Sequence, residues 1–204
     1  MLKPFLHRIT KLSFILKVKS TLPYLCSMLK KTMDELQRLS PDEFKAAEKT
    51  PVVVILENIR SMHNVGSVFR TCDGFRVEKL LLCGFTPKPP HRDIHKTALG
   101  ATESVNWESY ENTTDAILEL KKTGYTVYAI EQAHQSMMLH EIDMDTTHKI
   151  AVIFGNEAEG VSNESIAAAD ACIEIPQAGS KHSFNISVAA GIILWELFKR
   201  TNLK

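Results

Sequence analysis

Apolar residues along this chain follow two different periods. Short runs rich in branched residues, such as residues 150–154, are typical of strands buried on both faces of a parallel sheet. In other stretches, apolar residues recur at spacings of three and four, as they do on the buried face of a helix. The short runs predict strands at residues 52–56, 79–83, 104–107, 125–130, 150–154 and 171–175.

Helices are predicted between these strands. Ser162 can cap a short helix that ends at Ala168, and Ser183 or Asn185 can cap the last one. Ser40, with proline after it and glutamate three residues on, forms a capping box that predicts a helix as far as Glu48. The remaining helical segments are residues 65–75, 114–123 and 185–200, with a turn or two at 34–38.

Two segments lack either period. Residues 84–96 contain three prolines and residues 177–184 are polar, so both are predicted as loops. Strands and helices otherwise alternate six times or nearly so. This order predicts an α/β fold, a parallel sheet with helices on both faces. The loops at 155–160 and 177–184 follow two strands closely, and ligands of open α/β sheets bind where such loops converge.

Charge is distributed unevenly along the 204 residues, although 24 Lys and Arg balance 24 Asp and Glu. Residues 1–33 hold seven of the basic residues and no acidic one. Subtracting these seven from 24 leaves 17 basic against 24 acidic residues, a balance of −7 for residues 34–204. A mildly acidic body is not typical of nucleic-acid binding proteins. Any such partner would have to meet local basic patches or the basic N-terminus.

The first 32 residues form a basic, apolar extension to a predicted domain at 33–204. Lys17 and Lys19 interrupt its apolar runs, so it does not predict a membrane-spanning helix, and it lacks a secretory cleavage site. Its charge resembles that of a mitochondrial transit peptide. Alternatively, the start codon is assigned too early and Met28 or Met33 begins the protein. We favour this second interpretation and expect residues 1–27 to be dispensable.

Cysteine and histidine give little sign of special chemistry. The four cysteines have no paired spacing, which indicates a reducing compartment such as the cytoplasm and no disulfides. His91 and His95 lie four residues apart without a third ligand at metal spacing, so no metal site is predicted.

Three short motifs could carry chemistry, although each has a simpler interpretation. In the first, Asn64 occupies a predicted N-cap, Gly66 allows close approach to the first turn, and Arg70 borders the buried stripe of the helix. Alone, this is a capped helix with one surface arginine. The second motif, Gly155-x-Glu157-x-x-Gly160, could bind a hydroxyl or ammonium group, or could be a turn with a solvated glutamate.

The third motif contains Ser183 and Asn185, two polar side chains that enter a buried helix. They could hold a ligand or simply cap the helix. In their order and separation, the three motifs together resemble those of the SpoU, or TrmH-like, RNA ribose methyltransferases of the SPOUT superfamily. The resemblance extends from about residue 52 to residue 195. It has two departures, because Gln177 stands where the family usually has methionine and Phe184 where leucine is usual.

This resemblance implies an enzyme that transfers a methyl group from S-adenosylmethionine to a ribose 2′-hydroxyl of RNA. It also implies a SPOUT-type α/β knot, with a trefoil knot in the C-terminal region whose loops bind the cofactor, and a homodimer. The cofactor-binding residues implied by position are Ile130, Gly155, Gly160, Ile175, Ser183 and Phe184.

The resemblance also implies catalytic roles. Arg70 matches the family's essential arginine. Because a guanidinium keeps its charge in proteins, we expect it to bind the neighbouring phosphate and stabilise the developing alkoxide rather than to act as a base. Asn64, Ser183 and Asn185 are expected to position the ribose, the arginine and the cofactor. Glu157 is expected to order its loop and the arginine network.

Two alternatives to this function remain. A non-catalytic RNA-binding module could keep the same fold, whereas a dinucleotide-dependent oxidoreductase lacks its glycine fingerprint here. About fifty residues precede the first strand, too few for the separate RNA-binding domain of some members, which favours tRNA over rRNA. The last helix is apolar nearly all round, so we expect a homodimer interface near Trp195 or Phe198, unless the knot covers that face.

Overall fold

The computed structural model describes residues 29–32, 34–142 and 149–203. The chain divides into two compact units, Met1–Leu39 and Ser40–Lys204. In the first unit, the predicted turn at residues 34–38 is a short 3-10 helix, Asp34–Leu36. The predictions for residues 1–27 lie outside the described part of the chain.

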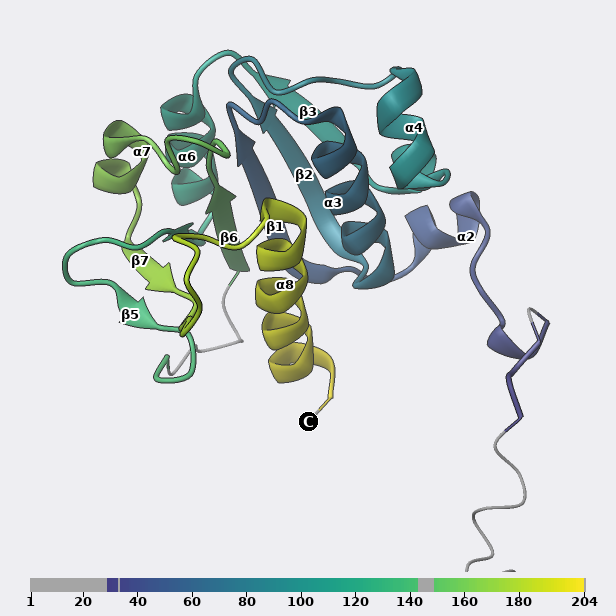
Figure 1. Cartoon of the computed structure of the whole chain (residues 1–204). Helices are drawn as coiled ribbons and strands as arrows, with labels where there is room; N and C mark the ends of the chain where they lie inside the picture. The colour runs from purple at the N-terminus through teal and green to yellow at the C-terminus, as the bar shows by residue number, and fades with distance from the viewer. Residues whose placement is uncertain (1–28, 33, 143–148, 204) are drawn as a thin grey trace, which may run out of the picture. The chain divides into compact units, whose positions relative to one another are not determined.

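The second unit is built on a parallel sheet of seven strands in the order β3-β2-β1-β6-β4-β7-β5 (Figure 1). At its centre, Val54 pairs with Leu80 on one side and with Val152 on the other. The parallel α/β prediction is therefore confirmed. The strands are β1 (Thr50–Glu57), β2 (Val77–Cys83), β3 (Trp107–Tyr110), β4 (Tyr125–Ile130), β5 (Met137–Met138), β6 (Lys149–Phe154) and β7 (Ala171–Glu174).

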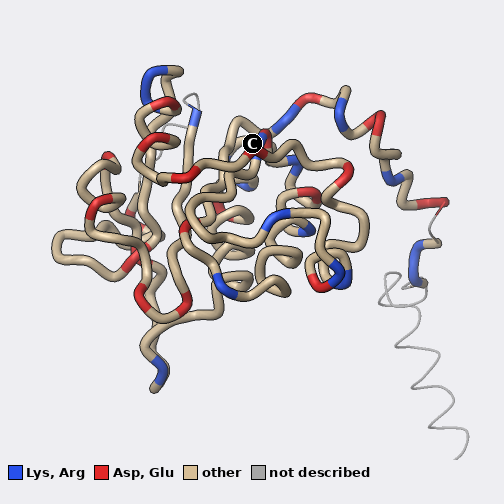
Figure 2. Tube along the Cα trace, turned by 90° about the horizontal axis from the view of Figure 1, so that it is seen from above, with Lys and Arg blue, Asp and Glu red and all other residues tan. Residues whose placement is uncertain are grey.

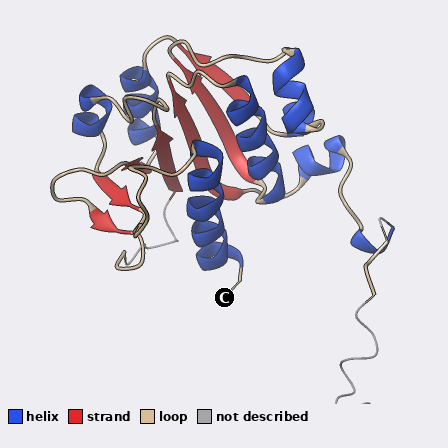
Figure 3. Ribbon diagram, in the orientation of Figure 1, coloured by secondary structure: helices blue, strands red, loops and turns tan. Residues whose placement is uncertain are grey.

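Helices cover both faces of this sheet, as Figure 3 shows. The caps predicted from sequence are present: the Ser40–Glu43 capping box, Ser162 before α7, and Asn185 before α8. The helices are α2 (Pro41–Ala46), α3 (Met62–Gly74), α4 (Arg92–Ala98), α5 (Ala101–Ser104), α6 (Thr113–Lys122), α7 (Asn163–Ala168) and α8 (Ile186–Asn202).

Alternating residues of the strands point into two separate cores. Val52, Val54 and Leu56 of β1 pack with α3, α4 and α8 on one face, whereas Val53 and Ile55 pack with α6 and α7 on the other. Both faces of β1 and β6 are therefore buried, which explains why residues 52–56 and 150–154 are apolar without alternation.

Two predictions in the first half of the domain are wrong. Residues 84–96 are not all loop, because α4 begins at Arg92, where the His91 ring accepts a hydrogen bond from the Asp93 amide (3.2 Å). The strand predicted at 104–107 begins only at Trp107. Ser104 instead ends α5 and donates a hydrogen bond to Asp73 (2.6 Å). One further strand, the two-residue β5, was not predicted, because it is too short to give a pattern.

The N-cap of α3 is also different from the prediction. Ser61, not Asn64, caps this helix, and its hydroxyl accepts a hydrogen bond from the Asn64 amide (3.3 Å). The helix thus begins at Met62, and the Asn64 side chain lies in the first turn. Gly66, one turn further on, faces α4. A Cβ there would collide with the Ile94 carbonyl and the Thr97 side chain. The close approach predicted at Gly66 is therefore made by a neighbouring helix.

None of the helices in the described ranges is both long and apolar enough to cross a membrane. Charged residues of both signs are interspersed along the traced chain, as Figure 2 shows.

Candidate active site

A cavity of about 560 Å³ opens at the carboxyl ends of β4, β6 and β7. This is the edge at which parallel α/β sheets bind ligands. Part of its wall is apolar and comes from Phe154, Ile173 and Ile186, and carboxylates and amides line the rest. All the residues implied as cofactor-binding line this cavity: Ile130, Gly155, Gly160, Ile175, Ser183 and Phe184.

The Gly155–Gly160 loop is closed on itself. The backbones of Asn156 and Gly160 exchange two hydrogen bonds of 2.9 Å each. A Cβ at Gly155 would overlap the Gly160 backbone, and Gly160 has φ +73° with the Glu131 carboxylate beside it. Both glycines are therefore required by the fold of the loop itself, and not only by close approach of a ligand.

Glu131 and Gln132, which the sequence analysis did not identify, hold two of the cavity loops. Glu131 accepts hydrogen bonds from the amides of Gln132 (2.8 Å) and Val161 (2.9 Å). Gln132 donates to the carbonyl of His182 (2.5 Å), as Gln177 does (3.1 Å). The signal for them was their place directly after a predicted strand, because that is where site residues of α/β proteins lie.

Glu157 joins the first and second motifs. Its carboxylate accepts hydrogen bonds from the amides of Arg60 (2.9 Å) and Ser61 (3.1 Å) and from the Asn64 side chain (2.9 Å). Burial raises the pKa of this carboxyl, but the hydrogen bonds from Arg60, Asn64 and Ser61 outweigh it and hold the pKa below its ordinary value. Glu157 is therefore ionised at neutral pH.

Asn185 joins the third motif to the other two. Its side-chain amide donates to the Asn64 oxygen (3.2 Å), and its own oxygen accepts from the Ser187 amide (2.9 Å) and hydroxyl (2.6 Å) at the start of α8. Three of the five predicted catalytic residues thus form one network of hydrogen bonds.

Arg70 and Ser183 lie outside this network. The exposed Arg70 lines a second, shallower hollow of about 550 Å³, with Lys96, Thr97 and Ser187 among its neighbours. Within the described residues, the Arg70 guanidinium forms no ion pair with a carboxylate. Ser183 is exposed at the wall of the first cavity. Asn185 lines the first cavity and Ser187 the second, so the first turn of α8 borders both.

Glu57 is a buried carboxylate that the sequence analysis also missed. It is only 3% exposed at the end of β1, and it accepts hydrogen bonds from the Ser162 amide (2.8 Å) and hydroxyl (2.9 Å) and from the Ser165 hydroxyl (2.5 Å). These bonds fix the N-terminus of α7 and hence the end of the Gly155–Gly160 loop. In residues 29–32, 34–142 and 149–203, no three His, Cys, Asp or Glu residues are placed to hold a metal ion.

Comparison with known proteins agrees with this geometry. The sequence is 34% identical over 170 residues to tRNA (guanosine(18)-2′-O)-methyltransferase of Thermus thermophilus. This match covers 83% of this chain and 85% of that protein. A solved TrmH/SpoU tRNA modifying enzyme from A. aeolicus superposes with a TM-score of 0.68 and 31% identity, over 76% of this chain and 77% of that one.

A second solved structure is an AdoMet-bound rRNA methyltransferase from Sinorhizobium meliloti. It has a TM-score of 0.70 and 29% identity, and the match covers 82% of this chain and 63% of that one. The model of the SpoU rRNA Methylase family matches residues 51–195, which contain the sheet, the cavity and the three motifs. The resemblance found in the sequence is thereby confirmed, and the chain belongs to the SpoU rRNA Methylase family.

Proposed function

We propose that this protein transfers a methyl group from S-adenosylmethionine to a ribose 2′-hydroxyl of RNA, with tRNA favoured over rRNA. The observation that carries the proposal is the network of Asn64, Glu157 and Asn185, which joins all three motifs at the edge of a cavity. The names of the Thermus and A. aeolicus relatives favour tRNA, whereas the Sinorhizobium relative is named for rRNA.

The cavity fits S-adenosylmethionine chemically. Ile130, Ile173 and Ile175 offer an apolar wall suited to an adenine ring, and Glu131 and Glu159 offer negative charge to a molecule that carries a sulfonium and an ammonium group. When bound, the cofactor supplies an electrophilic methyl group. The residues of this chain must then hold the ribose oxygen in line with it and stabilise the negative charge that develops on that oxygen.

Arg70 is suited to the second task. Its exposed guanidinium forms no ion pair with the described carboxylates and so can make charge-assisted hydrogen bonds to a phosphate. It keeps its positive charge, so it would stabilise an alkoxide by attraction and would not remove the hydroxyl proton itself. Ser183 and Asn185, at the cavity wall, would align ribose and cofactor, and Glu157 would hold Asn64 in place.

A homodimer is part of the proposal. Val188 and Trp195 on α8 are 49% and 47% exposed, although α8 packs on the sheet and on α3 with its other sides. Phe75, the C-cap residue of α3, covers part of this surface, with its ring centroid 5.4 Å from that of Phe198. The remaining apolar surface would be buried by a second copy.

The trefoil knot also remains a proposal. It is supported by the path of the chain after β7, where His182 is held against Gln132 before α8 returns to the sheet. We place the enzyme in the cytoplasm because its proposed substrate, tRNA, is present there.

The test is to incubate the purified protein with unmodified tRNA, rRNA and isotopically labelled S-adenosylmethionine, and to map 2′-O-methylated nucleotides by mass spectrometry. Gain of label at one tRNA ribose supports the proposal. Label in rRNA alone would show that rRNA, and not tRNA, is the substrate. RNA binding without any transfer of label would instead establish the non-catalytic RNA-binding module.

A further inference from the structure

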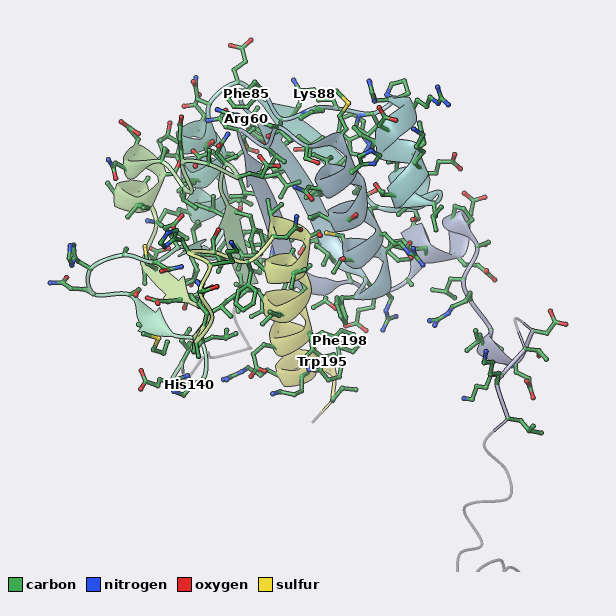
Figure 4. All side chains as sticks on the ribbon, in the orientation of Figure 1. Arg60, Phe85, Lys88, His140, Trp195 and Phe198 are labelled. Carbon is green, nitrogen blue, oxygen red and sulfur yellow. The ribbon has the colours of Figure 1, made fainter. Side chains whose placement is uncertain are left out.

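Phe85 is a large apolar side chain that the fold holds in solvent. It is 60% exposed and follows β2, at the same edge of the sheet as the cavity (Figure 4). Single exposed apolar residues are common on proteins and need no explanation by themselves. What distinguishes Phe85 is how its backbone is anchored and which groups surround it.

Its loop is fixed by buried hydrogen bonds. Thr86, which is only 2% exposed, donates from its hydroxyl to the Leu56 carbonyl (3.0 Å) and accepts from the Ile59 amide (3.0 Å). The Phe85 amide donates to the Asn58 side chain (3.3 Å), and Gly84 adopts φ +61° against that same side chain. The aromatic ring is thus presented by a backbone that is already ordered.

Asn58, which holds the Phe85 amide, also contacts the candidate active site. The Asn58 carbonyl accepts a hydrogen bond from the Asn156 side chain (2.7 Å), and Asn156 lines the cavity. Two residues on, the Arg60 amide binds Glu157. Since β2 lies two strands from β6, the ring is separated from the cavity by about two strand spacings, roughly 10 Å.

Cations lie on the loop that carries the ring and on the neighbouring loop after β1. Arg60, Lys88 and Arg92 are exposed, and within the described residues none of them forms an ion pair. Figure 4 shows Arg60, Phe85 and Lys88 at one edge of the molecule, where β1 and β2 end. Because the body of the protein carries a net charge of −7 by the count above, this local group of positive charges stands out against it. An aromatic face with cations on the same edge complements a base and the phosphates of its strand.

We propose that Phe85 is a stacking platform for an unpaired base of the RNA substrate, close in the strand to the methylated nucleotide, with Arg60 and Lys88 contacting the neighbouring phosphates. This inference rests on the proposed function, because it assumes an RNA substrate. It deepens that function by requiring a single-stranded segment at the site. Bases within a duplex are stacked on one another and present no face to an aromatic side chain.

The test compares Phe85→Ala with Leu118→Ala. Leu118 is a comparable control because it is 53% exposed on α6, which covers the sheet face opposite α3, α4 and α8. We expect Phe85→Ala to weaken binding of unmodified tRNA by about 5- to 150-fold, the range observed when a base-stacking side chain is truncated. Leu118→Ala should bind as the parent does. Phe85→Trp should restore binding, and affinity for S-adenosylmethionine should be the same in all variants.

Salt dependence separates stacking from phosphate contact. Lys88→Ala should reduce the slope of log K against log salt by about 0.7 to 0.9, the contribution of one phosphate contact. Phe85→Ala should lower affinity at every salt concentration without changing the slope, because stacking releases no counterions. The control for charge is Lys122→Ala, at the exposed end of α6, which should leave the slope unchanged.

Three outcomes would overturn the inference. If Phe85→Ala binds tRNA as tightly as Leu118→Ala while the parent still methylates RNA, the stacking role fails and the proposed function stands. A change of molecular mass in Phe85→Ala would assign the ring to a contact between two copies. If the parent binds no RNA at all, the inference and the proposed function fail together.

Discussion

Asn64 donates a hydrogen bond to Glu157 at 2.9 Å across 93 residues of sequence. The contact joins the first turn of α3 to the loop after β6, and Glu157 also accepts from the two amides that precede that helix. One ionised carboxylate therefore fixes the relative positions of two motifs. Asn64 in turn binds Asn185 and extends this order to the start of α8.

Replacing Glu157 should disturb the network without unfolding the protein. Glu157→Ala leaves three donors without their acceptor, so we expect methyl transfer to fall roughly 10- to 100-fold, as expected for a hydrogen bond to a charged group. Glu157→Gln keeps one oxygen and should retain more activity. Transfer rates at saturating S-adenosylmethionine measure the effect. Parental rates in both variants would remove Glu157 from the site.

The lowered pKa of Glu157 also predicts that the stability of the protein depends on pH. Because the pKa of Glu157 is lower in the folded protein, its contribution to stability is present above its ordinary value of 4.5 and is lost as pH falls through the lowered pKa. The melting temperature of Glu157→Gln should therefore lie below that of the parent at neutral pH, and the gap should close in acid. A gap that persists at low pH would contradict this sign.

Arg70→Ala should remove nearly all methyl transfer while folding and cofactor binding remain intact. The guanidinium is exposed on α3, so its removal leaves no buried group unpaired. Loss of one such electrostatic stabiliser costs about 10² to 10³ in rate. Binding of S-adenosylmethionine, measured by calorimetry, should match the parent. Equal turnover by mutant and parent would contradict the assigned role.

The sequence predicted the sheet well because strands that are buried on both faces are continuous runs of apolar residues. Residues 52–56 and 150–154 are apolar throughout, and both lie in central strands. Residues 104–107 were predicted as a strand because Val105 and Trp107 alternate with polar residues. Ser104 instead ends a helix, and its hydroxyl donates to Asp73, 31 residues away. A contact of that kind leaves no local pattern.

The candidate site was predicted in part for a similar reason. The order of three motifs indicated which residues belong to it, and the cavity contains every residue implied as cofactor-binding. The buried acceptor Glu57 and the loop anchor Glu131 were missed, since a single carboxylate after a strand looks the same whether it is solvated or satisfied by distant amides. Only the fold brings those amides to it.

Glu57→Ala tests how much the anchor of α7 stabilises the protein. Three hydrogen bonds end on this buried carboxylate, and its removal leaves the hydroxyls of Ser162 and Ser165 without an acceptor. We expect a loss of about 2 to 4 kcal/mol in the free energy of unfolding. Denaturant titration measures it. Glu174→Ala is a milder control because Glu174 is half-buried and accepts one hydrogen bond from a side chain, Ser136.

Gly66→Ala tests the contact between α3 and α4. The added methyl group would collide with the Ile94 carbonyl, so the two helices must separate, at a cost of about 1 to 3 kcal/mol. Gly74→Ala in the same helix is the matched control. A Cβ at Gly74 meets nothing within 4 Å, and alanine should leave stability unchanged or raise it by a few tenths of a kcal/mol. Equal melting temperatures for the two variants would contradict the close approach.

Trp195→Glu tests the proposed homodimer. The Trp195 ring lies 6.3 Å from that of Phe75 and is 47% exposed, so it borders the covered part of α8 and offers the rest to a partner. A carboxylate buried between two copies would lose its hydration without gaining a partner, which costs several kcal/mol. We expect light scattering at micromolar concentration to give a dimer for the parent and a monomer for Trp195→Glu, with methyl transfer falling in parallel. Leu118→Glu, which places the same charge at an equally exposed leucine on α6, should keep the parent mass and activity. A monomeric parent, or an unchanged mass in Trp195→Glu, would remove this face of α8 from the assembly.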